Sequence, residues 1–528
     1  MLLERVGRCL ILASWALAAL GPTTVRAAAG PDQRLLAAAQ EGDLPAVRTL
    51  IAAGVDVNAP RSDGSTPLMW AVHRDDLPMV DLLLKAGAKA DLSDEQGVTP
   101  LTLAAENGSL AVASRLLQAG ADPRKAQANG VTPLMVAARS GSVPVVKALT
   151  TAGADASTVI PATGQTALMW AVAERHLPVV RELLAAGADV RTASSLGFTA
   201  LLFAVRNGDT DTATALLEAG ADVNQPGSDG THALPLALVS GRGAMARLLV
   251  ERGADVNGTL HGVTALHAAA GKVDTWIRDW LRARHASVDA RSTAGLPPAE
   301  RVELVKLLLT RGAHINARAV NSTFVGLGIS GWYGARDPIS THVGDLKGAT
   351  PLWVAAYWAN GNSPDAAAAV DVIRELLAAG ADPNVTTADG STPLMAAAGL
   401  GHGSYQPGAE RGARSVSAEA AVALLVGAGA DVNAPNEGRF TALHGAAFRG
   451  LNEVIEYLVK HGAQIDAQDF RGRTAYRIAQ GAQQGFRVQQ WPKTAAFIAE
   501  LGADITLGVD GLTEERERAR AGATGAKP

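Results

Sequence analysis

Apolar residues recur along most of the chain in short blocks with helical spacing, and polar turns separate these blocks. In the segment LPMVDLLLKAG, which ends at Gly87, the residues Val80, Leu83 and Leu84 fall on one side of a helix. A shorter apolar block, PLMWAV, follows Thr66 and precedes that segment. The pattern therefore predicts pairs of short helices, each pair followed by a polar turn.

The predicted helix pair is repeated along the chain. A Gly-x-Thr-Pro/Ala-Leu string has its threonine at 66, 99, 132, 166, 199, 264, 350, 392, 441 and 474, and His232 takes the equivalent place in GTHAL. A second string, LLxxGAD or a close variant, has its glycine at 54, 87, 120, 153, 187, 220, 253, 312, 380, 429, 462 and 502. These 12 glycines predict about 12 units, and the first unit, near residues 32–58, lacks the leading turn.

Each marker has a physical role in a helix pair. The hydroxyl of Thr66 can cap a helix N-terminus, and Pro67 at the first helical position gives up no needed N–H group. Gly87 can end the second helix, because glycine tolerates the left-handed conformation that such an end requires. Neither helix can bury its apolar face alone, so neighbouring pairs must stack.

The repeated strings resemble ankyrin repeats, a family with units of about 33 residues and a T-P-L-H-x-A core. Examples are STPLMWAV, VTPLTLAA, QTALMWAV and FTALHGAA, and the resemblance covers residues 32–506. It implies an all-α solenoid of about 12 helix-turn-helix units with hairpin fingers and a concave binding face. In the family, the histidine of the core string ties one turn to the next, and only His267 and His444 keep it here. The other units are expected to rely more on apolar contact.

The chain divides into segments by this regularity. We expect a signal peptide at 1–29, a repeat domain at 30–508 and a flexible tail at 509–528. Within the domain, the regular repeats span 32–270, the insert-bearing repeats 271–440, and the C-terminal repeats with their cap 441–508. Extra residues place inserts at roughly 271–300, 318–347 and 399–418, and long loops in a compact array are usually functional or disordered.

Aromatic residues gather at the second insert and the helix after it. The insert carries Trp332 and Tyr333, and the following helix carries Trp353, Tyr357 and Trp358, in a chain with only 4% aromatic residues. One interpretation is a partner-binding patch, since Trp and Tyr dominate interface hot spots. The other is that the insert folds down and uses these rings as its own small core.

A second set of candidate partner-binding residues borders the first helices of the regular repeats. By analogy with ankyrin repeats, these positions face a partner, and their chemistry varies between units. An ordinary solvated surface is the alternative. The set comprises His73, Arg74, Glu106, Asn107, Arg139, Arg206 and Asn207.

The first 29 residues have the layout of a secretory signal peptide. Arg5 and Arg8 precede an apolar run from Cys9 to Leu20, and small residues allow cleavage after Ala27 or Ala29. An uncleaved membrane anchor is the alternative, although the apolar run is shorter than the roughly 20 residues of a spanning helix. Cleavage removes Cys9, the only cysteine, and a chain without thiols suits an oxidising compartment. We expect a periplasmic or secreted protein, from a bacterium.

Composition and local motifs argue against several chemical functions. A net charge of -4 is unlike the basic footprint of a nucleic-acid binder. The string from Gly326 to Gly331 matches G-x-G-x-x-G, but it lacks the strand and helix that a dinucleotide site needs. The 11 histidines form no close ligand pair, and the aspartates of the GAD strings fit turn chemistry. We therefore expect no catalytic residue, metal or cofactor.

The sequence favours a non-enzymatic scaffold that acts outside the cytoplasm as a monomer. It would bind a protein partner of unknown identity through the concave face and fingers, with no nucleic acid and no membrane span after signal cleavage. Two alternatives stay open. One is a small-ligand or catalytic site formed by the inserts at 271–418, and the other is a secreted effector that binds a host protein.

Overall fold

A computed structural model describes residues 31–273, 277, 296–320, 347–360, 363–400, 414–484 and 487–508. The predicted signal peptide and tail, most of the three predicted inserts, and the candidate residues Trp332 and Tyr333 lie outside this part of the chain. The chain divides into two compact units at Asp229–Gly230.

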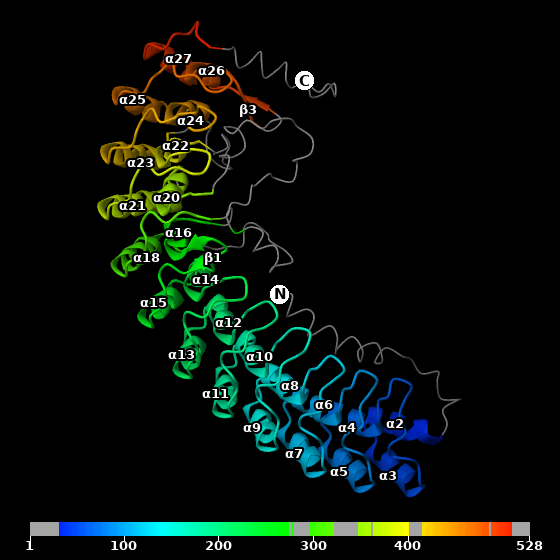
Figure 1. Ribbon diagram of the computed structural model, residues 1–528. Coiled ribbons are helices and arrows are strands. Elements are labelled where there is room, and N and C mark those ends of the chain that lie inside the picture. The colour runs from blue at the N-terminus through cyan, green and yellow to red at the C-terminus, as the bar shows by residue number, and fades with distance from the viewer. Residues whose placement is uncertain are drawn as a thin grey trace. The chain divides into compact units, whose positions relative to one another are not determined.

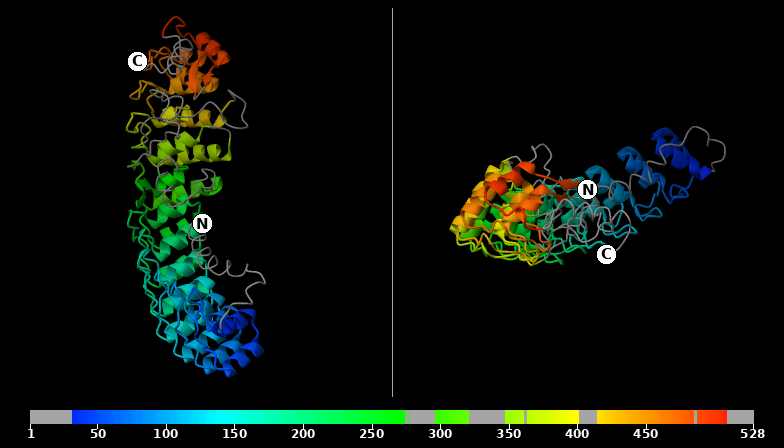
Figure 2. Two further views of the ribbon diagram at one scale, coloured as in Figure 1. Left: turned by 90° about the vertical axis from the view of Figure 1, so that its right-hand side faces the viewer. Right: turned by 90° about the horizontal axis from the view of Figure 1, so that it is seen from above.

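The first unit consists of six helix pairs that stack in chain order (Figures 1 and 2). The first helix of each pair packs against the first helix of the next, and so do the second helices from the second pair onward. The pairs are α2 (Pro31–Glu41) and α3 (Leu44–Ala52), α4 (Pro67–His73) and α5 (Leu77–Lys85), α6 (Pro100–Asn107) and α7 (Leu110–Gln118), α8 (Pro133–Ser140) and α9 (Val143–Thr151), α10 (Ala167–Ala173) and α11 (Leu177–Ala185), and α12 (Ala200–Asn207) and α13 (Thr210–Glu218).

The second unit also has six helix pairs in the part that the structure describes. They are α14 (Ala233–Val239) and α15 (Gly243–Glu251), α16 (Ala265–Ala270) and α18 (Pro298–Thr310), α20 (Pro351–Trp358) and α21 (Pro364–Ala378), α22 (Pro393–Ala397) and α23 (Val416–Gly427), α24 (Ala442–Arg449) and α25 (Asn452–Lys460), and α26 (Ala475–Gln480) and α27 (Pro492–Glu500). The prediction of an all-α repeat array of about 12 helix pairs is confirmed.

Two small antiparallel hairpins interrupt the second unit. Strands β1 (Thr259–Leu260) and β2 (Val263–Thr264) pair within a finger, with Thr259 opposite Thr264. Strands β3 (Ala482–Gln484) and β4 (Arg487–Gln489) pair between α26 and α27, with Ala482 opposite Gln489. The second hairpin takes up the extra residues of the last repeat.

The predicted helix caps are present. The Oγ1 atom of Thr66 accepts a hydrogen bond from the Met69 N–H, which satisfies one of the free donors at the start of α4. Gly87 has φ 92°, and the Ala88 N–H donates to the Leu83 carbonyl at 2.9 Å to close the end of α5. Val80 and Leu83 of the same helix are fully buried, as their spacing predicts.

Backbone hydrogen bonds join the fingers to one another within each unit. The Glu95 N–H donates to the Asp63 carbonyl at 3.1 Å, and the Ala128 N–H donates to the Gln96 carbonyl at 2.9 Å. His267 joins a first helix to a later finger, since its Nε2 lies 2.9 Å from the Ala349 carbonyl oxygen. His444 makes the same kind of bond to Arg473, at 3.3 Å. These two contacts have the role that the resemblance implies for the histidine.

The GAD aspartates act in turns. In each, a carboxylate oxygen accepts a hydrogen bond from the backbone N–H two residues later, at 2.8 to 2.9 Å. The residues are Asp122, Asp155, Asp189, Asp222, Asp255, Asp382, Asp431 and Asp504. This bonding confirms the prediction of turn chemistry for all eight.

Asparagines beside these turns tie neighbouring repeats together. The Asn433 Nδ2 donates to the Gly462 carbonyl at 2.9 Å, while its Oδ1 accepts from the Gln464 N–H at 2.8 Å. Asn58, Asn257 and Asn384 make the same pair of bonds to the repeats that follow them. One side chain thus satisfies a carbonyl and an N–H of the next turn, and these bonds set the register of adjacent repeats.

Part of the extra length in the irregular repeats is helical. The second helices α18, α21 and α23 have 13, 15 and 12 residues, whereas their counterparts in the regular repeats have 9. Each longer helix gains its residues at the N-terminus, as the fixed distance from its end to the marker glycine shows. None of the helices in the described ranges is both long and apolar enough to cross a lipid bilayer.

Candidate partner-binding site

The first set of candidate residues lies at the C-terminal ends of first helices in the first unit. His73 ends α4, Asn107 ends α6 and Asn207 ends α12, while Arg139 lies in the last turn of α8. Their side chains are exposed or half-buried. These residues form a row along the C-terminal ends of the first helices, where the sequence analysis placed them.

Several of these side chains bond to the preceding repeat. The Asn107 Nδ2 donates to the Val72 carbonyl at 2.8 Å, and the Asn207 Nδ2 donates to the Val172 carbonyl at 3.4 Å. Arg74 donates to the Gln40 carbonyl, also at 3.4 Å. The Val72 and Val172 carbonyls also accept the N–H groups of Asp75 and Arg175, at 2.9 and 3.1 Å, so each asparagine adds a second bond to a helix-end carbonyl. Asn107, Asn207 and Arg74 consequently hold adjacent repeats together, a role that the sequence analysis missed.

Two arginines of the row lie over aromatic rings. The Arg139 Cζ is 5.3 Å from the Trp170 ring centroid, and an Nη atom of Arg139 is 3.6 Å from a Glu106 carboxylate oxygen. The Arg206 Cζ is 5.2 Å from the Phe203 ring centroid. Cation–π contact and ion pairing hold a guanidinium in one orientation while part of it stays accessible. Arg139 and Arg206 are therefore each held in a defined orientation by neighbouring side chains.

The aromatic rings beneath these side chains were not among the predicted residues, and Trp70 and Phe203 are buried. Trp70, Trp170 and Phe203 occupy the same position of their first helices, directly after the place of the family histidine. The His73 ring meets Trp70 edge to face, with centroids 5.9 Å apart. The signal that could have identified them is the presence of large rings at one repeat position that smaller residues fill in other units.

The second set of candidate residues is packed into the second unit. Trp353 is 0% exposed, and its ring stacks on Tyr357 with centroids 5.5 Å apart. Trp358 meets Tyr357 edge to face at 5.8 Å. Burial raises the pKa of the Tyr357 phenol, and the positive charge of Arg449 opposes this effect. Trp353 thus has no surface for a partner and belongs to the core of the helix stack, while most of the insert predicted to use these rings lies outside the described residues.

Trp358 packs against Gly271 and Lys272, where the first predicted insert begins. We call the contacts among Gly271, Lys272, Trp358 and Asp365 the Gly271 junction. The Trp358 Nε1 donates to the Lys272 carbonyl at 2.9 Å, and a Cβ on Gly271 would come within 2.5 Å of the Trp358 ring. The Lys272 Nζ lies 5.6 Å from that ring centroid and 3.5 Å from an Asp365 carboxylate oxygen. Only a glycine fits at position 271 in this arrangement.

Arg301 of α18 is buried beside the same junction. It is 3% exposed and donates to the Ala269 carbonyl at 3.3 Å and the Leu296 carbonyl at 3.2 Å. Burial lowers the pKa of the Arg301 guanidinium, and the Asp365 carboxylate, 3.9 Å away, opposes this effect. The charged groups of this junction hold α16, α18 and α21 together.

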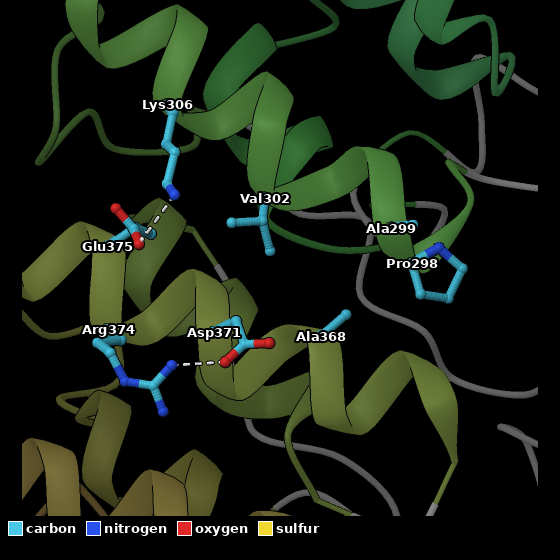
Figure 3. A pocket seen from close by; sticks show the side chains of 8 residues that line it. All are labelled: Pro298, Ala299, Val302, Lys306, Ala368, Asp371, Arg374 and Glu375. Carbon is cyan, nitrogen blue, oxygen red and sulfur yellow. Dashed lines mark hydrogen bonds and ion pairs between the residues drawn. The ribbon is translucent and has the colours of Figure 1, made fainter.

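A hollow of about 470 Å³ lies between α18 and α21 (Figure 3). Its lining contains Pro298, Ala299, Val302 and Ala368, together with two ion pairs. Lys306 pairs with Glu375 at 3.4 Å, and Arg374 pairs with Asp371 at 2.5 Å.

The lining of this hollow lacks the side chains of a nucleophilic catalytic site, and most of the inserts that would form the alternative site at 271–418 lie outside the described residues. The hollow has no Ser, Cys, His or Tyr in its lining, and its charges are paired rather than converging on one point. Within the described ranges, no cluster of three or more His, Cys, Asp or Glu side chains could hold a metal ion. The hollow is thus a surface depression lined by apolar side chains and paired charges.

Comparison with known proteins finds the same repeat along most of the chain. Models of ankyrin repeats match residues 35–127, 120–194, 184–259 and 201–292, then 347–388, 389–437 and 425–479. The chain is 32% identical over 124 residues to alpha-latroinsectotoxin-Lt1a of Latrodectus tredecimguttatus, which is 24% of this chain and 7% of that protein. It is 36% identical over 122 residues to ankyrin repeat and SOCS box protein 16 of Mus musculus, which is 23% of this chain and 25% of the relative. The similarity thus spans a quarter or less of these relatives' lengths.

Proposed function

Because the chain belongs to the ankyrin-repeat family, we propose that it is a non-enzymatic scaffold that binds a protein partner. Stacked repeats commonly bind other proteins through an extended surface that is already folded. A surface that needs no ordering loses less conformational entropy when the partner binds. The hydrogen bonds between repeats, including those of Asn107 and Asn207, provide this rigidity.

The contact surface is the row of first-helix ends in the first unit. The observation that carries this proposal is Arg139, half-buried between Trp170 and Glu106. Arginine and tryptophan are enriched among the few residues that supply most of the binding energy in interfaces. Large side chains lie against helix ends in both units. In the first unit, Arg74 lies against Gly42 and His176 against Gly141, and the second unit has similar contacts. Trp358 lies against Gly271, Arg449 against Gly399 and Trp491 against Gly450.

The test is a binding measurement with variants of this row. The partner is first captured by chemical cross-linking from a periplasmic extract, and its affinity is then measured by calorimetry. R139A combined with R206A is expected to weaken binding at least tenfold, or about 1.4 kcal/mol, because two ordered cations leave the interface.

The matched control carries the same change on the opposite side of the repeats. K147A combined with R181A removes two exposed cations from the second helices α9 and α11, and it should leave the affinity unchanged. Equal affinity for both double variants would refute the proposed surface.

We place this function outside the cytoplasm of a bacterium, in the periplasm or the medium. The support is the layout of residues 1–29, with two early arginines, an apolar run and small residues before Gly30. The absence of cysteine after position 9 agrees with an oxidising compartment. An effector that binds a host protein is the variant of this proposal in which the chain leaves the cell.

A further inference from the structure

Several pairs of neighbouring fingers pack in the same register. The glycine two residues before one N-cap threonine lies against the residue five before the next N-cap threonine. Gly64 precedes Thr66 in this way, and a Cβ on Gly64 would come within 2.9 Å of the Cα of Asp94, which is five residues before Thr99. The same contact joins Gly97 to Gln127, Gly164 to Ser194 and Gly390 to Asn436. A residue in this position therefore marks the start of a following finger.

Gly508 lies in this position beside the finger of the last described repeat. Gly472 is two residues before Thr474, and a Cβ on Gly508 would come within 2.8 Å of the Gly472 carbonyl oxygen. The Arg477 Nε donates to the Leu507 carbonyl at 3.1 Å and holds the chain here. The main chain at Gly508 is thus in register for another finger.

Residues 510–522 have the spacing of a finger and a first helix. An Asp-Gly-x-Thr string ends at Thr513, which is five residues after Gly508, and eight residues separate Thr513 from Gly522. The eight residues of α6 separate its N-cap from Gly108 in the same way, and Gly108 closes that helix in the left-handed conformation. Two glutamates stand where other units have Pro or Ala followed by Leu, so the repeated string does not extend to this segment.

The side chains of this segment fit a finger and a helix. Leu512 directly precedes Thr513, a position at which Val98, Val263 and Phe440 are at most 2% exposed in their repeats. Glutamates at 514, 515 and 517 and arginines at 518 and 520 place negative charge near a helix N-terminus and positive charge near its C-terminus, which stabilises a helix. Leu512 therefore supplies the apolar contact of a finger, and the residues after Thr513 supply a helix with favourable end charges.

Side chains that other repeats bury are exposed on the last described repeat. Ile505 is 50% exposed, whereas Val57, Val190 and Val256, equally far after their marker glycines, are each 8% exposed. Each of these valines belongs to a repeat that another repeat follows. Because covering Ile505 removes apolar surface from water, further chain is expected to lie against it.

The corresponding side of α26 is polar and accessible. Tyr476 and Arg477 are half-buried, whereas Leu443 and His444 at the same positions of α24, which packs against α26, are at most 1% exposed. The Arg477 Cζ lies 5.6 Å from the Tyr476 ring centroid. A helix beside α26 is therefore complementary if it brings acidic side chains, and residues 514–517 carry three glutamates.

We propose that residues 508–522 form the finger and first helix of a thirteenth repeat, which docks on α26 and on the turn at Ile505. Gly508 begins the finger, Leu512 fills the apolar position before the N-cap, and the glutamates lie near Arg477. For the residues up to Gly522, this assignment replaces the expectation of a flexible tail at 509–528. It does not depend on which partner the first unit binds.

The test is limited trypsin digestion of the full chain, because the proposed helix carries arginines at 516, 518 and 520. A docked helix is cleaved only when it opens, so the wild type should release the peptides of residues 517–528 slowly.

The variant L512D puts a carboxylate at a position that is buried in other fingers, and it should speed this release by about tenfold or more. Mass spectrometry measures the release. Hydrogen exchange of the α26 amides is an independent readout, and it should also become faster in L512D.

The matched control is A523D, which adds the same charge one residue beyond Gly522. It should leave the rate of release and the exchange of α26 unchanged, and circular dichroism checks that both variants are folded. Equal rates for the wild type and L512D would overturn the proposal, because they would show a segment that is not docked. Slow release that appears only at high protein concentration would also overturn it, because a second copy of the chain would then cover α26.

Discussion

At the scale of single residues, buried polar side chains decide how the repeats respond to pH. His267 is 1% exposed between Thr264 and Ala349, and burial lowers its pKa from 6.5 to about 4. The neutral ring is therefore the native form. His444 occupies the equivalent place in another repeat, and burial lowers its pKa as well.

We predict that His267 makes the second unit less stable in acid. Between pH 6.5 and 4 the unfolded chain binds a proton at this ring that the folded chain does not, so the free energy of unfolding falls as the pH falls. The full effect of this residue is about 3 kcal/mol. Urea unfolding at pH 7.5 and 4.5 measures it, and H267Q should show a smaller difference between the two pH values. An identical difference in both proteins would contradict the prediction.

At the scale of elements, the regular turns depend on contacts that recur once per repeat. Asn433 serves as donor and acceptor to the turn that begins at Gly462. Asp466 occupies the same place in the next repeat and acts as acceptor only, to the Asp504 N–H at 2.9 Å. The acceptor bond of Asp466 is thus sufficient for its repeat to stack on the next one. At Asn433 the donor bond to the Gly462 carbonyl is a second contact between the repeats.

We predict that N433A lowers the free energy of unfolding by about 1 to 2 kcal/mol, because two hydrogen bonds between repeats are lost. N433D keeps the acceptor and should cost less than N433A. Chemical denaturation measures both changes, and hydrogen exchange of the Gln464 amide reports the loss at the turn itself. An alanine variant as stable as wild type would show that solvent replaces these bonds without cost.

At the scale of the whole molecule, residues 1–29 precede the repeat array and have the layout of a secretory signal peptide. We predict that cells export the protein and that the mature chain begins at Ala28 or Gly30, after removal of the apolar run. N-terminal sequencing of protein from the periplasmic fraction and from the medium measures this. Recovery from the medium alone supports the effector alternative, whereas a cytoplasmic chain that keeps Leu2 contradicts export.

The sequence by itself determined the fold, because each repeat carries its own local signals. Threonine caps, Gly87 and its equivalents, and apolar residues at helical spacing act within one helix pair. A single copy of this pattern would leave the fold ambiguous, whereas 12 copies in sequence predict a repeat array. The turn role of the GAD aspartates followed from the same local reasoning, since each bonds to an amide two residues away.

Only the tertiary structure decided which candidate residues are accessible and what they contact. Trp353 is buried and Arg139 lies over Trp170, although both belong to first helices with the same pattern. The partners of Asn107 and Arg301 lie in other elements, and the hollow between α18 and α21 exists because two lengthened helices lie side by side. Such contacts join residues about 30 or more positions apart, and local periodicity carries no information about them.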